Sequence, residues 1–332
     1  MSSDALSHTL AVALLASSIP LSVSAQYGKP LYGQDDRLEI VEASVGYDVL
    51  ARSVAAVISV AQLAANPAGQ TVAESKAIPS SKELCAEARF SRQPRIAVCT
   101  AFLVDRDLVL TSGHCVVPDG DRDQGGLPCS DAAFLFDFRV DARGDFSWRV
   151  RDSQIRHCLA VVEHEYAPRR SRDWALVKID PVDDRAPLAL ASTGEAPPGS
   201  TLSVVGHPQG LPLKVALGAR VIRVESQASF LTDSDTFQGN SGSPVFAEDA
   251  VLAGRPEVLG MLTAGDEDYV SDPARGCRRE RLCAKGVCLG EQVISLDNMR
   301  QVIQARKRHC EQGFVRSLRV VERPGGSNIP CR

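Results

Sequence analysis

The stretch TFQGNSGSPVF (236–246) places Ser241 in a run of small and polar residues that is typical of a tight turn. This stretch alone leaves two interpretations open, a surface loop between strands and a turn that presents a nucleophile. A serine acts as a nucleophile when a base takes its proton and an anion orients that base. The rest of the chain must therefore supply a histidine and a carboxylate in suitable positions.

His114 is the candidate base. It stands near the end of CTAFLVDRDLVLTSGHC (99–115), where a turn after the apolar run LVLT holds it at the end of a strand. Cys115 follows it, and Cys99 lies one strand earlier, at a separation suited to a disulfide between neighbouring strands. Such a bond would fix the loop that carries the histidine. His207, in GHPQG (206–210), is instead predicted to pack or cap a loop.

Asp173 is the candidate for the orienting carboxylate. In SRDWALVKI (171–179) it directly precedes an apolar strand, beside Trp174. A carboxylate at the start of a buried strand needs a hydrogen-bond donor, since desolvation without one costs several kcal/mol. An imidazole N–H would serve. The other interpretation is an aspartate that caps a turn, which better explains Asp180 at the far end of the strand.

Gly239 acquires a role once these three residues are taken together. The backbone N–H groups of Gly239 and Ser241 can converge on the oxygen of a tetrahedral intermediate, and glycine permits the peptide orientation that this requires. These two residues are the predicted oxyanion hole.

Short apolar runs punctuated by Gly, Pro, Asp and Asn predict the elements that position these residues. Their spacing, without regular intervening helices, indicates an all-β sandwich or barrel, and the length suits two small barrels packed together. After residue 265 the chain is Cys-rich, and 295–310 has the pattern of a helix with Ser295 as its cap. The predicted strands fall within 54–61, 96–104, 107–111, 133–138, 147–151, 159–163, 174–179, 201–206, 219–225 and 257–264.

The domain boundaries follow from these patterns. Residues 1–25 form a predicted signal peptide, because TLAVALLASSIPLSV (9–23) is apolar and VSA (23–25) is a small-x-small cleavage pattern. Residues 26–52 are polar and turn-rich and are predicted to be a pro-segment or an N-terminal arm. The two-barrel domain is expected over 53–265, and a Cys-rich segment with a C-terminal helix over 266–332.

Charge and cysteine content exclude several classes. The 37 basic and 41 acidic residues nearly balance, at a formal charge of −4, so nothing favours a nucleic acid or anionic membrane as partner. The ten cysteines all follow the predicted cleavage site, which indicates disulfides in an exported protein. A zinc site in CRRERLCAKGVC (277–288) is disfavoured because the stretch has no CxxC pair and no histidine before His309. We expect no metal or cofactor.

The stretches TSGHC, RDWALV and GNSGSPVF, in the order His, Asp, Ser, resemble the chymotrypsin/trypsin-like serine endopeptidases. GNSGSPVF and GHPQGLPLKV point to the bacterial branch that includes glutamyl endopeptidases. The same order excludes an α/β-hydrolase. Over about residues 53–265, the resemblance implies two packed six-stranded antiparallel β-barrels with the triad in the cleft between them. His114 would be the base, Asp173 its orienter and Ser241 the nucleophile.

The resemblance also names candidate substrate-binding residues. Asp235 aligns with the aspartate at the base of the trypsin specificity pocket, beside Thr236, and would favour Arg or Lys before the scissile bond. A polar turn at 233–236 is the alternative. Leu262 occupies the place of the histidine that binds glutamate in glutamyl endopeptidases, so glutamate specificity is not expected. Thr263 to Gly265 would pair with the substrate backbone.

Asn240 departs from the family. Animal members carry an aspartate there that pairs with a newly cut N-terminus, and an amide cannot form that ion pair. The sequence therefore predicts a secreted (extracellular or periplasmic) monomeric serine endopeptidase acting on protein or peptide substrates, without a membrane anchor in the mature form. A non-catalytic, disulfide-stapled binding module that retains the fold is the alternative.

Overall fold

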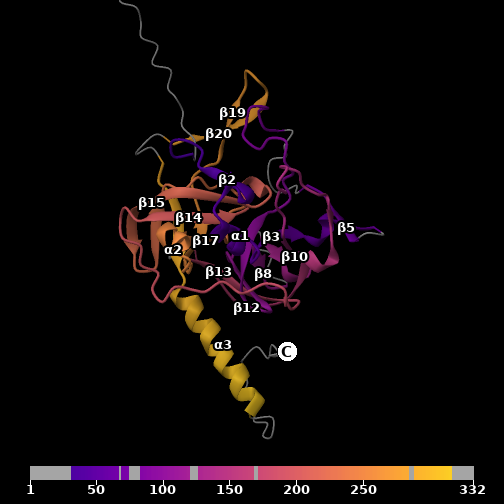
Figure 1. The fold of residues 1–332 in the computed structure, drawn as a ribbon, viewed down its shortest axis with the longest axis vertical. Coiled ribbons are helices and arrows are strands. Elements are labelled where there is room, and N and C mark those ends of the chain that lie inside the picture. The colour runs from indigo at the N-terminus through magenta and orange to yellow at the C-terminus, as the bar shows by residue number, and fades with distance from the viewer. Residues whose placement is uncertain are drawn as a thin grey trace, which may run out of the picture.

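A computed structural model describes residues 31–66, 69–74, 83–119, 126–167, 171–283 and 288–315 (Figure 1). The predicted signal peptide lies outside the described residues, as do Cys331 and the side chain of Cys310.

Six antiparallel strands close the first barrel in the order β10-β12-β13-β7-β6-β3. Alternation along the strands explains why nearly all their residues are apolar. In β7, Val109 points into the barrel core, while Leu108 and Leu110 belong to a cluster shared with the second barrel. The strands are β3 (Val54–Ser59), β6 (Cys99–Asp105), β7 (Leu108–Thr111), β10 (Ala132–Phe136), β12 (Ile155–Ala167) and β13 (Arg172–Ile179).

The second barrel has the order β14-β17-β18-β21-β16-β15 and is closed by the pairing of β14 with β15. A further strand, β2 (Arg37–Glu39), adds to β15. The all-β, two-barrel fold predicted from the sequence is thereby confirmed. The strands are β14 (Thr201–Gly206), β15 (Lys214–Ser226), β16 (Ser229–Thr232), β17 (Pro244–Ala247), β18 (Val258–Ala264) and β21 (Glu291–Ser295).

The remaining strands and the helices lie outside the two barrels. The small strands are β4 (Leu63–Asn66), β5 (Gly69–Val72), β8 (Val116–Val117), β9 (Leu127–Pro128), β11 (Arg149–Val150), β19 (Tyr269–Asp272) and β20 (Cys277–Glu280). The α-helices are α1 (Val45–Ala51), α2 (Glu248–Leu252) and α3 (Asp297–Val315). Figure 1 shows α3 extending from the end of the molecule opposite the β19–β20 hairpin. Short 3-10 turns occupy Ile40–Glu42, Val60–Gln62, Cys129–Asp131, Asp152–Gln154 and Pro208–Gly210.

The predicted C-terminal helix is present, shifted slightly along the chain. It begins at Asp297, whose backbone N–H donates to Ser295 Oγ at 3.3 Å, so the predicted capping serine contacts the first turn. Leu296, Met299 and Ile303 enter the cluster between the barrels. The apolar face predicted for this helix therefore anchors it.

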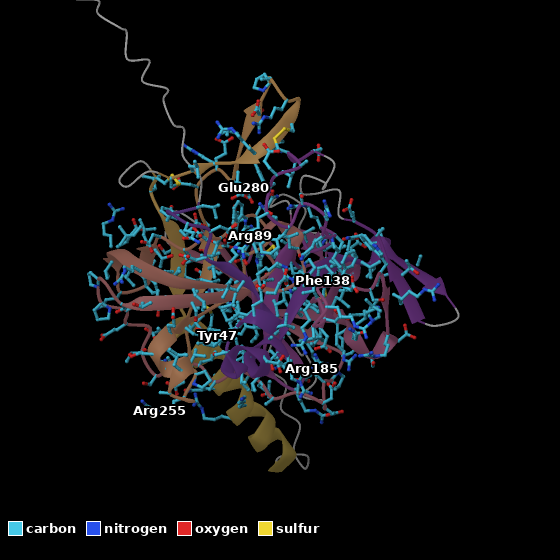
Figure 2. All side chains as sticks on the ribbon, turned by 45° about the horizontal axis from the view of Figure 1, so that its top comes forward. Tyr47, Arg89, Phe138, Arg185, Arg255 and Glu280 are labelled. Atoms are coloured by element: carbon cyan, nitrogen blue, oxygen red, sulfur yellow. A yellow bond between two sulfur atoms is a disulfide. The ribbon has the colours of Figure 1, made fainter. Side chains whose placement is uncertain are left out.

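The N-terminal segment is more ordered than its composition indicates. Residues 26–50 have no convincing periodicity, yet 31–51 contain β2, a 3-10 turn and α1. Tyr47 and Leu50 of α1 are almost fully buried in the cluster between the barrels (Tyr47 is labelled in Figure 2). Residues 31–51, called the N-terminal arm below, therefore pack against the two barrels.

Four disulfides occur among the described residues, and they join Cys85 to Cys277, Cys99 to Cys115, Cys129 to Cys158, and Cys283 to Cys288. The three cysteines of the 277–288 stretch are thus oxidised and cannot act as zinc thiolates. None of the helices in the described part of the chain is both long and apolar enough to span a bilayer.

Candidate active site

His114 and Asp173 are joined by two hydrogen bonds across the first barrel. Nδ1 of His114 lies 2.7 Å from Oδ2 of Asp173, and the backbone N–H of His114 donates to Oδ1 at 2.9 Å. Asp173 is 4 % exposed at the start of β13. Because an ionised carboxylate can only accept, the hydrogen on the ring must sit on Nδ1. The lone pair of Nε2 is then left to act as a base.

The turn that carries His114 is held from three sides. Gly113 allows a close approach, since a Cβ at this position would lie 2.4 Å from the carbonyl oxygen of Glu165. Nε2 of His164 donates to the carbonyl oxygen of Gly113 at 2.8 Å. The disulfide Cys99–Cys115 ties the turn to β6. The pattern around His164 carried no signal of this role in the sequence.

The loop that carries Ser241 packs against the same region. The carbonyl oxygen of Ser241 accepts the N–H of Thr100 at 2.8 Å and lies 3.8 Å from Sγ of Cys115. The hydroxyl of Ser241 donates to the carbonyl oxygen of Thr263 at 3.4 Å. No hydrogen bond joins the Ser241 hydroxyl to His114. The structure thus brings the two loops together with the hydroxyl turned toward β18.

Two backbone donors in this loop, one on each side of Asn240, have no acceptor among the described residues. The N–H groups of Asn240 and Gly242 donate to the carbonyls of Phe237 and Leu262, whereas those of Gly239 and Ser241 make no recorded hydrogen bond. Gly239 has φ +100°, and a Cβ there would lie 2.4 Å from the carbonyl oxygen of His207. Only glycine fits without strain, and this conformation leaves both donors available.

A cavity of about 200 Å³ opens beside Ser241 and is lined in part by carboxylates. Oε2 of Glu291 accepts the hydroxyl of Thr236 at 2.6 Å, and Oε1 accepts the N–H of Asp266 at 3.3 Å. Among the described residues no salt bridge reaches Glu291, Asp266 or Asp268, although the charges of Arg37 and Arg278 act to lower the pKa of Asp268. The lining residues are Phe237, Gln238, Ser241, Leu262, Ala264, Gly265, Asp266, Asp268 and Glu291. Of the predicted substrate-binding residues, Gly265 lines this cavity, and Thr236 contacts the lining residue Glu291.

Asp235, which the resemblance predicts at the base of the specificity pocket, is not among the residues that line this cavity. Its two oxygens accept the backbone N–H groups of Tyr32 and Asp36, each at 2.7 Å. The N-terminal arm therefore occupies this carboxylate. The sequence signal that identified Asp173, a carboxylate at the start of an apolar strand, is also present in EQVIS (291–295) and could have identified Glu291.

Burial perturbs the carboxyl groups around the cavity. Desolvation raises the pKa of Asp268 to about 7, although the N–H of Gln238 donates to it at 2.6 Å. Desolvation also raises the pKa of Asp235 to about 7. The pKa of Glu291 is raised well above its usual range, by burial first and by nearby negative charge next. An incoming cation would favour the ionised forms of these carboxyl groups and lower their pKa values.

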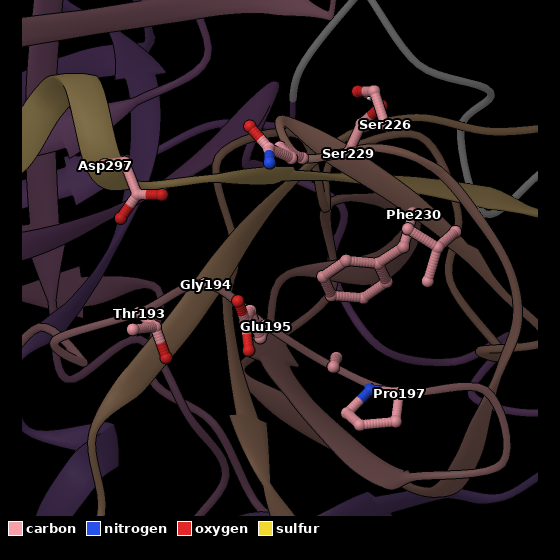
Figure 3. Close-up of a pocket in the computed structure, with 11 residues that line it drawn as sticks. Thr193, Gly194, Glu195, Pro197, Ser226, Ser229, Phe230 and Asp297 are labelled. Carbon is pink, nitrogen blue, oxygen red and sulfur yellow. Dashed lines mark hydrogen bonds between the residues drawn. The ribbon is translucent and has the colours of Figure 1, made fainter.

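Two other features carry no catalytic chemistry. A cavity of about 520 Å³ lies at the second barrel, and its lining holds none of the candidate triad (Figure 3). Residues at its rim include Glu195, Phe230 and Asp297. His114 lies near Cys99 and Cys115, but both cysteines are oxidised, so this group cannot bind a metal as thiolates.

His207 occupies the structural position expected for it. Its ring is buried, stacks on Phe138 and has Nδ1 2.9 Å from the carbonyl oxygen of Leu211. Burial lowers the pKa of His207 to about 3, so the ring is neutral. His207 supports the loop beneath Gly239.

Comparison with known proteins finds one family model that matches part of the chain. Residues 99–254 match the family model described as a trypsin-like peptidase domain, a range that includes His114, Asp173 and Ser241. No curated protein sequence matches the chain.

Three solved structures are similar to the chain. A Glu endopeptidase in complex with MPD is 16 % identical, with a TM-score of 0.48, over 84 % of this chain and 99 % of that one. The VesB protease of Vibrio cholerae is 15 % identical, with a TM-score of 0.47, over 82 % and 67 %. The Rv3671c protease of M. tuberculosis, in its active form, is 14 % identical, with a TM-score of 0.45, over 78 % and 83 %.

Proposed function

We propose that this chain, which carries a trypsin-like peptidase domain over residues 99–254, is an exported serine endopeptidase that works through an acyl-enzyme intermediate. The observation that carries the proposal is the pair of hydrogen bonds from His114 to the buried Asp173. This pairing fixes the ring and its tautomer, which is what a general base for serine requires.

In the proposed reaction, Ser241 Oγ attacks the carbonyl carbon of the scissile peptide while its proton passes to His114 Nε2. The oxygen of the tetrahedral intermediate accepts from the N–H groups of Gly239 and Ser241. His114 then gives its proton to the leaving amine, the C–N bond breaks and an acyl-enzyme remains. Water, deprotonated by His114, releases the acid and restores Ser241.

The position of the Ser241 hydroxyl is compatible with this reaction. Its hydrogen bond to the Thr263 carbonyl is long, at 3.4 Å. Rotation of the Ser241 side chain about χ1 toward His114 therefore costs little free energy. Hydrogen bonds between catalytic groups often shorten only when substrate is bound. A peptide paired with the Thr263–Gly265 edge would occupy the space toward which the hydroxyl now turns.

The cavity beside Ser241 supports a preference for Arg or Lys before the scissile bond. Entry of a guanidinium or ammonium group would favour the ionised forms of Glu291, Asp266 and Asp268, and a buried cation forms strong charge-assisted hydrogen bonds with carboxylates. In this proposal the specificity carboxylate is Glu291 and not Asp235. Leu262 offers no donor for an acidic side chain.

We further propose that residues 1–25 direct export and are removed before Gln26. Four disulfides support this, because structural disulfides form and persist in oxidising compartments. We propose that residues 53–265 form the first barrel and all but one strand of the second, and that 266–332 adds the last strand, β21, and helix α3.

The test is covalent labelling together with peptide cleavage. The mature protein is treated with a diphenyl phosphonate, the modified residue is mapped by mass spectrometry, and a peptide library is digested in parallel. We expect the label on Ser241, cleavage by the wild type, and neither in Ser241→Ala or His114→Ala. A folded wild type that is neither labelled nor active would favour the non-catalytic binding module.

A further inference from the structure

We propose that residues 31–39 of the N-terminal arm remain in the active enzyme and that Arg37 is a positioning residue for the loop that carries Ser241. The proposal rests on the function proposed above and concerns how the oxyanion donors of Gly239 and Ser241 are held in place.

Arg37 is a cation buried against this loop. The side chain is 0 % exposed, and its guanidinium lies 4.3 Å from the ring centroid of Phe237, two residues before Gly239. Leu31, at the start of the arm, packs into the same small cluster as Phe237. Since cation–π contacts are stronger when desolvated, this pair fixes the underside of the loop.

Two carboxylates hold the Arg37 guanidinium in place. Nε and Nη2 donate to Asp35 at 2.9 and 2.7 Å, and Nη2 also donates to Oε1 of Glu280 at 2.9 Å. Glu280, labelled in Figure 2, belongs to β20, which the disulfide Cys85–Cys277 ties to the segment between β3 and β6 of the first barrel. The Arg37 guanidinium is thus held by Asp35 of the arm and by Glu280 of the β19–β20 hairpin, which a disulfide stabilises.

The same network reaches the backbone next to the oxyanion donors. Oε1 of Glu280 also accepts Nε2 of Gln209 at 2.9 Å, and the N–H of Gln209 donates to the carbonyl oxygen of Gln238 at 2.6 Å. Gln209 has φ +58°, a strained value for a residue with a side chain, so its neighbours must hold it there. The peptide between Gln238 and Gly239 is therefore linked to Arg37 through two side chains.

The N-terminal arm also forms hydrogen bonds with the residues that precede the Ser241 loop. Asp235, four residues before Gly239, accepts the backbone N–H groups of Tyr32 and Asp36. Asn240, by contrast, is satisfied locally, since its Oδ1 accepts the hydroxyl of Ser243 at 3.1 Å. Asn240 cannot form the ion pair that animal members make with a cut N-terminus, and in this proposal the buried cation that supports the loop is the side chain of Arg37. Cleavage that matures the enzyme must then fall before residue 31.

The first experiment measures kcat per active site in Arg37→Met, with active sites counted by phosphonate titration. Loss of one oxyanion donor costs roughly 10² to 10³ in rate, so we expect kcat to fall about 100-fold with KM nearly unchanged. Arg37→Lys, which keeps the charge, should recover part of the loss. Arg223→Met, which alters an exposed arginine on the second barrel, should match the wild type.

A purely structural role would lower the melting temperature and the number of titratable sites but leave kcat per site unchanged, and that result overturns the proposal. If Arg37→Met does not fold, Phe237→Leu removes the ring and keeps the ion pairs, and an unchanged kcat per site in that variant overturns it equally. A wild type that cannot be labelled at Ser241 would contradict the proposed function instead.

The second experiment needs no variant. The N-terminus of the phosphonate-labelled wild-type chain is determined by intact mass under denaturing conditions. We expect labelled chains to begin at or before Leu31. Labelled, fully active chains that begin after Glu39 would overturn the proposal.

Discussion

The carboxylate of Asp173 receives two hydrogen bonds from His114, one from the backbone N–H at 2.9 Å and one from ring Nδ1 at 2.7 Å. The backbone bond fixes the turn, and the ring bond fixes the tautomer. A single buried carboxylate thereby sets both the place and the protonation of the candidate base.

Asp173→Asn should lower kcat by roughly 10⁴, because the amide presents a donor to Nδ1 and favours the tautomer whose Nε2 carries the hydrogen. KM should change little. Asp180→Asn is the matched control, since Asp180 accepts the backbone N–H and faces Nδ1 of His157 in the same way on the surface. Steady-state kinetics on a peptide amide checks both. Equal activity of Asp173→Asn and the control would contradict the role of Asp173.

Gly239→Ala should lower kcat by about 10² or more, since the added methyl meets the carbonyl oxygen of His207 and must displace the oxyanion donors. Gly254→Ala provides the comparison, because Gly254 also has positive φ but has no atom within 4 Å of an added Cβ. That variant should lose about 1 kcal/mol of stability and keep its kcat. Comparable kcat losses in the two variants would show that backbone strain alone is responsible.

Glu291→Gln should reduce kcat/KM for substrates with Arg or Lys before the scissile bond by roughly 10- to 100-fold, the value of a charge-assisted hydrogen bond. Cleavage after Leu should be far less affected. Asp235→Asn should leave the ratio of Arg to Leu cleavage unchanged, because that carboxylate binds the arm. Matched peptides that differ only at this residue give the ratio. A preference lost with Asp235→Asn and kept with Glu291→Gln would reverse the assignment.

Asp268 should make the protein less stable as pH rises from about 4 to 7. Its pKa is raised from 3.8 to about 7 by burial, so the folded state binds the proton more tightly than the unfolded state. The stabilisation is complete below pH 4 and is lost as pH passes 7. Asp268→Asn should flatten this part of the profile. Melting temperatures measured between pH 4 and 8.5 test this, and parallel profiles for wild type and variant would refute it.

The local patterns of the sequence were sufficient for the barrels and for the candidate triad. Alternating apolar runs predict strands because burial of one or both faces selects those residues locally, as in LVLT and WALV. His114, Asp173 and Ser241 each stand at a strand end or in a turn, where short segments already contain the relevant signal. A resemblance carried by three ordered motifs then indicates which residues should meet.

Only the tertiary structure shows which residues the N-terminal arm contacts and which residues line the cavity beside Ser241. In the sequence, Arg37 and Asp235 are polar residues in turn-rich stretches. Their roles come from the distant segments that bury them in the folded protein.

 A carboxylate whose partners come from 199 and 203 residues away cannot be distinguished, from the sequence, from one that faces a substrate. The physical reason is that desolvation and charge pairing depend on which distant segments exclude water from a group. The neighbouring residues in the sequence do not indicate which segments those are.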